Sequence, residues 1–326
     1  MERAIVLESE GTAQATARDL SARSRRHSER TAIIAHEGTF TYGDLLTAAR
    51  QVASALLEGT TDLNEKRVAF LIPASFNFVA VLWGIWQAGG IAVPLAVSHP
   101  RTELEYALTD AGADIVVAAP EFADTLRPLA EKLACRFCLT TDIFSTPAAN
   151  LPRIAEQRRA LILYTSGTTS KPKGVVTTHR NIQAQVTTLI SAWAWRTDDR
   201  ILLVLPLHHV HGLINVLTCA LWAGAACELL PQFNAKTVWE KFLTERFTLF
   251  MAVPTIYTKL IAEWENSSKA KQAAMSAACA RMRLMVSGSA ALPVSVLAKW
   301  RAISGHVLLE RYGMTETGMI LSNPMR

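Results

Sequence analysis

Short apolar segments alternate with longer amphipathic segments along most of the chain. The apolar segments have the length of strands, and the segments between them carry apolar residues at helical spacing. The expected strands are residues 67–72, 91–93, 114–118, 201–205, 227–230, 249–252, 284–287 and 307–309, with a further strand that starts near residue 161. The expected helices are residues 76–88, 103–111, 180–193, 213–223, 235–245, 255–264 and 294–303. This alternation predicts an α/β fold with largely parallel sheets flanked by helices.

A stretch rich in Pro and Thr interrupts the pattern around residues 140–160. The chain has 326 residues, half of them hydrophobic, which is enough for a sizeable core. We therefore predict two stacked α/β subdomains, residues 1–150 and 151–326, the second of which holds the nucleotide site.

The longest apolar segment, residues 76–88, is too short to span a bilayer and is expected to form a buried helix. Acidic residues at Glu2, Glu8 and Glu10 argue against a secretory leader and, weakly, against a mitochondrial presequence. The five cysteines are dispersed, so Cys135 and Cys138 are expected to be a buried or strand cysteine pair and not a zinc site. These features together predict a cytoplasmic protein without a transmembrane segment.

Charge does not point to a nucleic-acid partner. The 33 Lys and Arg residues and 28 Asp and Glu residues give a net charge of +5, and both signs are scattered. The only basic cluster is residues 23–30, RSRRHSER, and no basic stripe with interleaved aromatic residues is present. This cluster is interpreted as a solvated face, with attraction for anionic substrates as the alternative.

Residues 164–176 read YTSGTTSKPKGVV and follow the apolar run 160–164. Hydroxyl groups, exposed backbone N–H groups, glycines and lysines together suit a loop that wraps phosphates. The alternative is a solvated linker, but a linker needs neither a preceding strand nor the apolar Val175 and Val176 that follow. The loop is expected between a strand and a helix, at the carboxyl end of the strand. It lacks the Gly-Lys-Ser/Thr of a Walker loop.

Two further blocks follow at consistent spacing, LPLHHVHGL at residues 205–213 and ERYGMTETGM at 310–319. With these three blocks the chain resembles the adenylate-forming superfamily of acyl-CoA synthetases, luciferases and peptide-synthetase adenylation domains. Segments 251–260 (MAVPTIYTKL) and 282–293 (MRLMVSGSAALP) are most similar to the malonyl-CoA synthetase branch.

The resemblance implies that a substrate carboxylate attacks the α-phosphorus of ATP, releases pyrophosphate, and leaves an acyl-adenylate that is transferred to CoA. It implies a magnesium ion on Glu316, and catalytic roles for Thr168, Lys173, His209 and Glu316. Ser170 stands where glycine is usual in the family. The nucleotide-binding residues that the resemblance implies are Thr165, Ser166, Gly167, Thr168, Thr169, Lys173, Gly288, Ser289, Ala290, Glu310, Arg311, Tyr312, Gly313, Met314 and Thr315.

Substrate choice has fewer signals. His209 matches the family histidine beside the acyl carboxylate, and a core histidine is the alternative reading. A malonate-type acid carries a second carboxylate that needs a cation, preferably a bidentate arginine. Arg283 is the predicted cation, with a purely structural role as the alternative.

Members of the resembled family continue beyond the third block with a ribose-binding aspartate, a hinge and a mobile C-terminal domain that supplies a lysine. These have no counterpart in the 326 residues, so we expect this chain alone to show little or no CoA ligation. The predicted function is the N-terminal part of a malonyl- or methylmalonyl-CoA ligase. A short- or medium-chain fatty acid or aryl acid CoA ligase is the alternative within the enzyme class, and a non-catalytic nucleotide- or acid-binding module is the alternative outside it.

Overall fold

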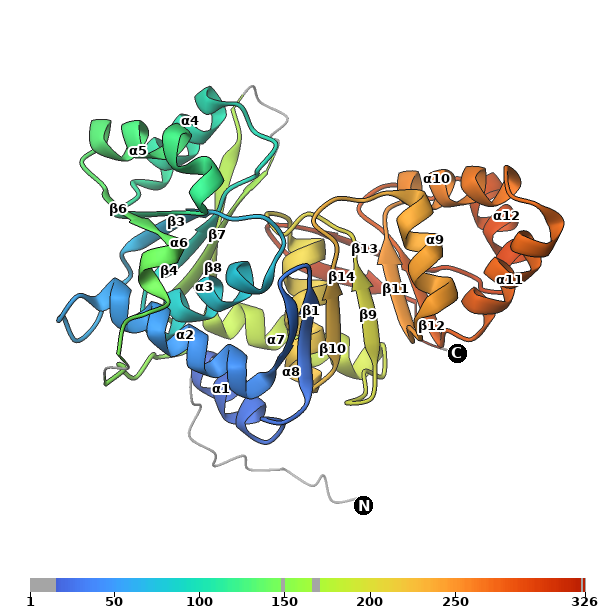
Figure 1. Cartoon of the computed structure of the whole chain (residues 1–326), viewed down its shortest axis with the longest axis horizontal. Helices are drawn as coiled ribbons and strands as arrows, with labels where there is room; N and C mark the ends of the chain where they lie inside the picture. The colour runs from blue at the N-terminus through green and yellow to red at the C-terminus, as the bar shows by residue number, and fades with distance from the viewer. Residues whose placement is uncertain (1–15, 148–149, 166–170, 324, 326) are drawn as a thin grey trace, which may run out of the picture.

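The computed structural model describes residues 16–147, 150–165, 171–323 and 325. Two β-sheets organise this part of the chain, one with six strands and one with eight. Figure 1 shows two lobes. One is built on the six-stranded sheet, and α9 to α12 form the far end of the other. None of the described helices has the length and apolar character needed to cross a bilayer.

The six-stranded sheet has the order β6-β5-β3-β4-β7-β8, and only the β7–β8 pair is antiparallel. Helices α4 and α5 lie on one face and α2 and α3 on the other (Figure 1). The elements of this lobe are α1 (Thr16–Arg25), α2 (Tyr42–Leu57), β3 (Arg67–Leu71), α3 (Phe76–Gln87), β4 (Ile91–Pro94), α4 (Arg101–Ala111), β5 (Ile115–Ala118), η1 (Pro120–Phe122), α5 (Ala123–Lys132), β6 (Arg136–Leu139), α6 (Thr140–Ile143), β7 (Arg159–Thr165) and β8 (Lys173–Thr178).

Strand β3 shows why this sheet is covered on both faces. Val68 and Phe70 belong to the core cluster shared with α2 and α3, whereas Ala69 and Leu71 belong to the cluster shared with α4 and α5. Successive side chains of a strand point to opposite faces, so a strand buried on both faces reads as a continuous apolar run.

The eight-stranded sheet has the order β14-β13-β12-β11-β9-β10-β1-β2, with antiparallel pairs at its two ends. Its interior strands are parallel, so their carboxyl ends lie along one edge. The elements are β1 (Thr31–Ala35), β2 (Gly38–Thr41), α7 (His179–Ala192), β9 (Arg200–Leu203), η2 (His211–Thr218), α8 (Cys219–Ala223), β10 (Ala226–Leu229), α9 (Ala235–Thr244), β11 (Leu249–Ala252), α10 (Pro254–Glu265), α11 (Lys269–Ala280), β12 (Leu284–Ser287), α12 (Val294–Ser304), β13 (Leu309–Met314) and β14 (Gly318–Ser322).

The sheets do not divide the chain at residue 150 as predicted. The hairpin β1–β2 pairs with β10 in the eight-stranded sheet, and β7 and β8 join β4 in the six-stranded sheet. The chain thus crosses twice between the sheets, because strand pairing depends on distant partners that the local pattern does not reveal.

The predicted setting of the phosphate loop is corrected as well. Strand β8 stands between the loop and helix α7, so the loop joins two antiparallel strands. Thr178 then caps α7, because its side chain accepts a hydrogen bond from the backbone N–H of Asn181. The expected strand at 307–309 instead begins at Leu309 and continues to Met314.

Candidate active site

The two stems of the phosphate loop are the last residue of β7, Thr165, and the first residue of β8, Lys173. These two residues are register partners, and Tyr164 pairs with Gly174 one step further into the hairpin. Lys173 is exposed. The predicted residues Ser166, Gly167, Thr168 and Thr169, together with Ser170, lie outside the described residues.

The predicted small-residue block, Gly288 to Ala290, follows β12 at the carboxyl edge of the eight-stranded sheet. Ser289 has a φ of 68°, a left-handed conformation that is uncommon for a residue with a side chain and tends to occur at functional sites. A Cβ on Gly288 would lie 2.4 Å from Nε of Arg311. Glycine at 288 is therefore needed to let the arginine side chain pack against the backbone.

Arg311 is the buried cation of this region. It lies on β13, its exposed fraction is 7%, and its Nη2 donates to Oγ of Ser289 over 3.2 Å. Within the described part of the chain it forms no ion pair with a carboxylate, and its buried Nε has no hydrogen-bond partner. Burial lowers the pKa of Arg311 to about 10, so the side chain remains charged near neutral pH. A buried and unpaired cation is costly, and an anionic ligand would relieve that cost.

His211 completes this group. Its Nδ1 lies 3.1 Å from Oγ of Ser289, and burial together with the charge of Arg311 holds the pKa of His211 well below its usual value. Because Ser289 already accepts from Arg311, its hydroxyl can donate to Nδ1 of the neutral ring. The proton of that ring then sits on Nε2, which is buried and has no partner in the described residues. Arg311 and His211 thus each offer at least one unused buried N–H donor.

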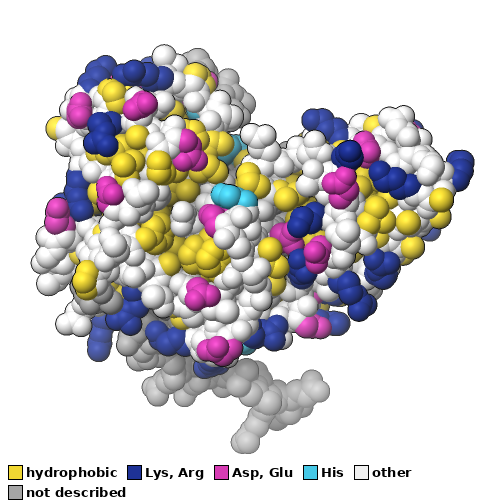
Figure 2. Space-filling model, viewed as in Figure 1, with side chains coloured by type: hydrophobic (Ala, Val, Ile, Leu, Met, Phe, Trp, Pro, Cys, Tyr) yellow, Lys and Arg dark blue, Asp and Glu magenta, His cyan; other side chains and the backbone are white. Residues whose placement is uncertain are grey.

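His209 precedes η2 by two residues and lines a second cavity. A cavity of about 280 Å³ is lined by His99, His208 and His209 together with Thr165 and Pro172. Figure 2 shows histidine side chains in the hollow between the two lobes. Burial and the neighbouring His99 lower the pKa of His209, so its ring is neutral near pH 7 and can accept or donate a hydrogen bond.

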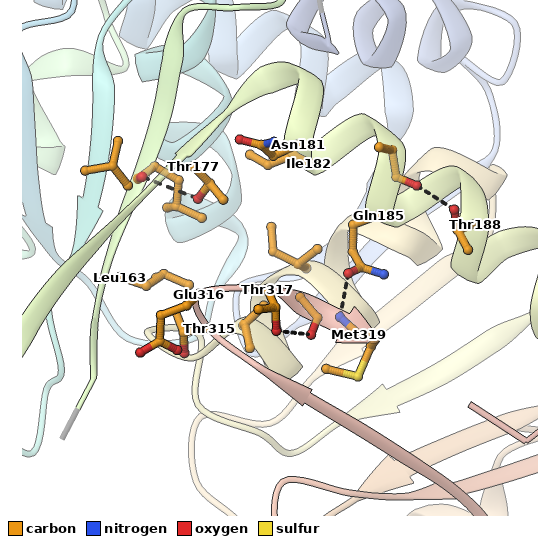
Figure 3. Close-up of a pocket in the computed structure, with 16 residues that line it drawn as sticks. Leu163, Thr177, Asn181, Ile182, Gln185, Thr188, Thr315, Glu316, Thr317 and Met319 are labelled. Carbon is orange, nitrogen blue, oxygen red and sulfur yellow. Dashed lines mark hydrogen bonds between the residues drawn. The ribbon is translucent and has the colours of Figure 1, made fainter. Parts of the chain in front are cut away.

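Glu316 and Thr315 lie on the turn between β13 and β14 and line a cavity of about 390 Å³ (Figure 3). The opposite wall is formed by β7, β8 and helix α7. Gln185 of α7 accepts from the backbone N–H of Met319 over 2.5 Å and so ties the β13–β14 hairpin to the helix. The carboxylate of Glu316 is exposed, and it forms no ion pair with another residue that the structure describes.

The residues around Glu316 suit a magnesium ion that is bound mainly by water and phosphate. They do not suit a metal ion that needs several protein ligands. Among the described residues, no group of three or more His, Cys, Asp or Glu side chains could hold a metal ion. Mg²⁺ commonly takes one or two carboxylates, several waters and the substrate's phosphate oxygens. A single exposed carboxylate is therefore consistent with the predicted ligand.

The remaining predicted residues, Glu310, Tyr312, Gly313 and Met314, belong to β13. Tyr312 has an exposed fraction of 55%, so its ring face is available for stacking. A Cβ on Gly313 would lie 2.2 Å from the carbonyl oxygen of Gly318, which explains glycine there by the close pairing of β13 with β14. Their predicted contacts with nucleotide stay predictions.

The structure argues against Arg283 as the cation for a second carboxylate. Arg283 precedes β12, whereas the Gly288 loop follows it, so the two lie at opposite ends of the strand, roughly 15 Å apart. Its guanidinium is bonded to Asp199, with Nε donating to Oδ1 over 2.8 Å, and it donates to the carbonyl oxygen of Trp193. The sequence could not reveal this, because Asp199 is 84 residues away.

His211 is a functional candidate that sequence reasoning underweighted. Its only sequence signal is that it is the third histidine of the HHVHG block. To single it out from His208 and His209 required the position of Ser289 in the structure. Asn215 is a further example, because it is fully buried on η2 and neither of its amide atoms has a described partner. A π-type helix such as η2 is often found at functional sites.

Comparison with known proteins identifies the family of this chain. The family model described as AMP-binding enzyme matches residues 20–326. The chain is 47% identical to the mitochondrial malonate–CoA ligase ACSF3 of Bos taurus over 314 residues, which is 91% of this chain and 54% of that protein. It is 36% identical to a malonate–CoA ligase of Arabidopsis thaliana over 334 residues, 91% of this chain and 55% of that protein.

A solved structure, apo MatB from Rhodopseudomonas palustris, superposes with a TM-score of 0.83 at 30% identity, and the match covers 95% of this chain and 62% of that one. The chain spans about half the length of the curated relatives it matches. Its fold is that of the N-terminal part of acyl-CoA synthetases, as predicted. The chain belongs to the AMP-binding enzyme family.

Proposed function

We propose that this chain is the N-terminal part of a ligase that activates a small dicarboxylic acid, malonate or methylmalonate, as its adenylate and transfers the acyl group to CoA. One observation carries the choice of acid. Arg311 is a buried guanidinium without a described carboxylate partner, and it lies beside the hydroxyl of Ser289 and the ring of His211.

The physical reasoning concerns the second carboxylate of the acid. A monocarboxylate would leave the charge of Arg311 uncompensated in a buried site, whereas a dicarboxylate brings the missing negative charge. The free donors on Nε of Arg311 and Nε2 of His211 suit a carboxylate, and hydrogen bonds to charged groups are the stronger ones. Arg311, which the sequence assigned to the nucleotide, therefore replaces Arg283 in the proposed substrate site.

The reacting carboxylate of the same acid attacks the α-phosphorus of ATP. Two anions must approach each other, so the site has to reduce their repulsion and align them. In this proposal Lys173 and the hydroxyl of Thr165 contact the polyphosphate, and the neutral ring of His209 orients the attacking carboxylate. Glu316 would hold magnesium, which when bound neutralises phosphate charge.

The relatives support this substrate class. Two are malonate–CoA ligases, and a further solved structure at 30% identity is described as a malonyl-CoA ligase with methylmalonyl-CoA and AMP bound. The step that uses CoA is proposed for the whole ligase, since this chain spans about half the length of its curated relatives. The predicted cytoplasmic location stays a prediction, which the mitochondrial label of the animal relatives does not support.

The test is ATP–pyrophosphate exchange with malonate, methylmalonate, acetate and octanoate, on this chain and on a longer version that carries the C-terminal domain. Arg311→Leu should reduce exchange with the dicarboxylates by about ten- to a hundredfold, as expected for loss of charge-assisted hydrogen bonds. Arg311→Lys should restore only part of it, because a lysine cannot bind bidentately. Arg281→Leu is the matched control, since Arg281 is exposed and bonds only within its own helix.

The outcomes separate the alternatives. Exchange with octanoate or acetate but not with malonate in the wild type would indicate a monocarboxylate ligase. ATP binding without exchange for any acid, even in the longer version, would indicate a non-catalytic module. An Arg311→Leu variant that loses all acids equally would refute the assigned role of Arg311.

A further inference from the structure

Two tyrosine hydroxyls join helix α4 to the residues next to the two stems of the phosphate loop, Pro172 and Tyr164. On the β8 side, Oη of Tyr106 donates to the carbonyl oxygen of Pro172 over 2.8 Å. On the β7 side, Oη of Tyr164 donates to Oδ2 of Asp110 over 2.9 Å and lies 3.2 Å from the carbonyl oxygen of Ala107. Tyr106 and Asp110 are four residues apart, so they occupy one face of the helix.

Asp110 links these two contacts. Its Oδ1 lies 3.5 Å from Oη of Tyr106, while its Oδ2 accepts from Tyr164. The same carboxylate therefore faces both phenols. Burial, followed by the proximity of Asp110, raises the pKa of Tyr164, which keeps this phenol protonated and able to donate.

Packing around the phenols supports a built contact. The rings of Tyr106 and Tyr164 meet edge to face with centroids 6.3 Å apart. Gly174 lies opposite Tyr164 in the hairpin, and a Cβ there would come within 3.3 Å of the Tyr164 ring and 3.0 Å of Ile162. Nζ of Lys171 lies 5.9 Å from the centroid of Tyr106, so a lysine of the loop sequence also rests near this helix.

We propose that Tyr106 and Asp110 are positioning residues. Through their contacts with Pro172 and Tyr164, they hold the two stems of the phosphate loop in the arrangement that binds the polyphosphate of ATP. Neither residue needs to touch the nucleotide. We call the contacts of Tyr106 and Asp110 with Pro172 and Tyr164 the clamp. The effect of the clamp on ATP affinity rests on the proposed function, because it requires that the loop binds ATP. The clamp as a structural contact does not rest on that function.

The physical basis is preorganisation. Fixing the stems before ATP arrives moves part of the ordering cost from binding to folding, and the affinity for ATP rises accordingly. Near the loop, ladder hydrogen bonds join the two stems to each other, whereas β7 pairs with β4 at Leu161, four residues before Thr165. Helix α4 packs through Leu104 and Leu108 against residues of β3 and β5 in the same sheet. Its contacts with Pro172 and Tyr164 therefore connect the stems to the packed core.

The first test compares ATP dissociation constants of four variants with that of the wild type by calorimetry. Tyr106→Phe removes one hydroxyl and should weaken ATP binding about three- to tenfold, and Asp110→Ala should weaken it about tenfold. Asp110→Asn keeps an acceptor oxygen for Tyr164 and should stay within about twofold of wild type. Thr109→Ala is the control on the same helix, because its hydroxyl bonds only to the carbonyl of Glu105 and is exposed.

Melting temperatures of all variants are measured without ligand, and the proposal requires the ATP effect at unchanged global stability. Wild-type ATP affinity in both Tyr106→Phe and Asp110→Ala would overturn it. So would an equal loss in Thr109→Ala, which would indicate a general disturbance of the helix.

Hydrogen–deuterium exchange without any ligand separates the clamp from the proposed function. Faster exchange of the amides at Thr165 and Lys173 in Tyr106→Phe and Asp110→Ala is expected whether or not ATP binds. If exchange rises and no form binds ATP, the clamp stands and the proposed function fails. If exchange at these amides is unchanged, the clamp itself is refuted.

Discussion

Replacing Arg283 by leucine tests whether this arginine serves the fold or the substrate. Its partner, Asp199, has an exposed side-chain fraction of 1%, and that of Arg283 is 17%. Leucine would remove the guanidinium that bonds both carboxylate oxygens of Asp199. Asp199 would keep two other donors, the backbone N–H of Arg196 at 2.7 Å and the hydroxyl of Thr248 at 2.8 Å.

The expected cost follows from the charge that stays behind. Removing one partner of a buried ion pair costs about 3–5 kcal/mol, because the other charge remains desolvated. The two remaining hydrogen bonds to Asp199 place the expected loss in unfolding free energy near the lower end, about 3 kcal/mol. Removing both charges, with Asp199→Asn and Arg283→Leu together, should recover most of this loss, since no buried charge is left unpaired.

Urea unfolding followed by tryptophan fluorescence measures the stability of the two single variants, the double variant and the wild type, which gives a double-mutant cycle. Acid preference is measured in parallel by ATP–pyrophosphate exchange on the longer version. We expect a stability loss without a change in the ratio of malonate to monocarboxylate use. Wild-type stability of Arg283→Leu, together with selective loss of malonate use, would refute the structural role and return Arg283 to the substrate site.

Three further predictions concern pH, packing and metal. Burial, with a contribution from Arg158, lowers the pKa of His179 to about 4, below its unfolded value. Below pH 6.5 the unfolded chain therefore binds the extra proton, and the free energy of unfolding should fall by about 2–3 kcal/mol between pH 7 and pH 4. Thermal melts at several pH values should show a smaller pH dependence of stability for His179→Phe. Gly288→Ala should displace the side chain of Arg311 and lower the free energy of unfolding by about 1–3 kcal/mol through overpacking. A melting temperature and a malonate dependence of exchange that both match wild type would contradict this. Glu316→Gln should lower exchange by about a hundredfold or more and raise the magnesium concentration needed for half-maximal exchange, and an unchanged magnesium titration would remove Glu316 from the metal site.

The sequence predicted most of the strands because they are buried on both faces. Strand β3 and strand β5 read as continuous apolar runs, and the structure places them in the middle of the six-stranded sheet. Strand β8 escaped prediction, since its residues 173–178 are short, polar at the end and only partly buried. The hairpin partner β7 supplies the pairing that makes this segment a strand.

The candidate site divides in the same way. Glycines, hydroxyl residues and the Glu316 block are local signals, because the chemistry of phosphate and metal binding requires particular residue types close together in the chain. The role of an arginine is not a local signal. Arg283 and Arg311 look alike in the sequence, and only their partners distinguish them. Arg283 is paired with a carboxylate 84 residues away, whereas Arg311 donates to the hydroxyl of Ser289, which also contacts His211.

By itself, the sequence determined the α/β class, the family and the blocks that carry the chemistry, because periodicity and residue type act over a few neighbouring residues. Tertiary structure decided which strands share a sheet, which arginine is free to meet an anion, and which helix face holds the phosphate-loop stems. These depend on contacts between residues far apart in the chain, such as Tyr106 with Pro172 across 66 positions. Burial and pairing free energies arise only when such residues meet.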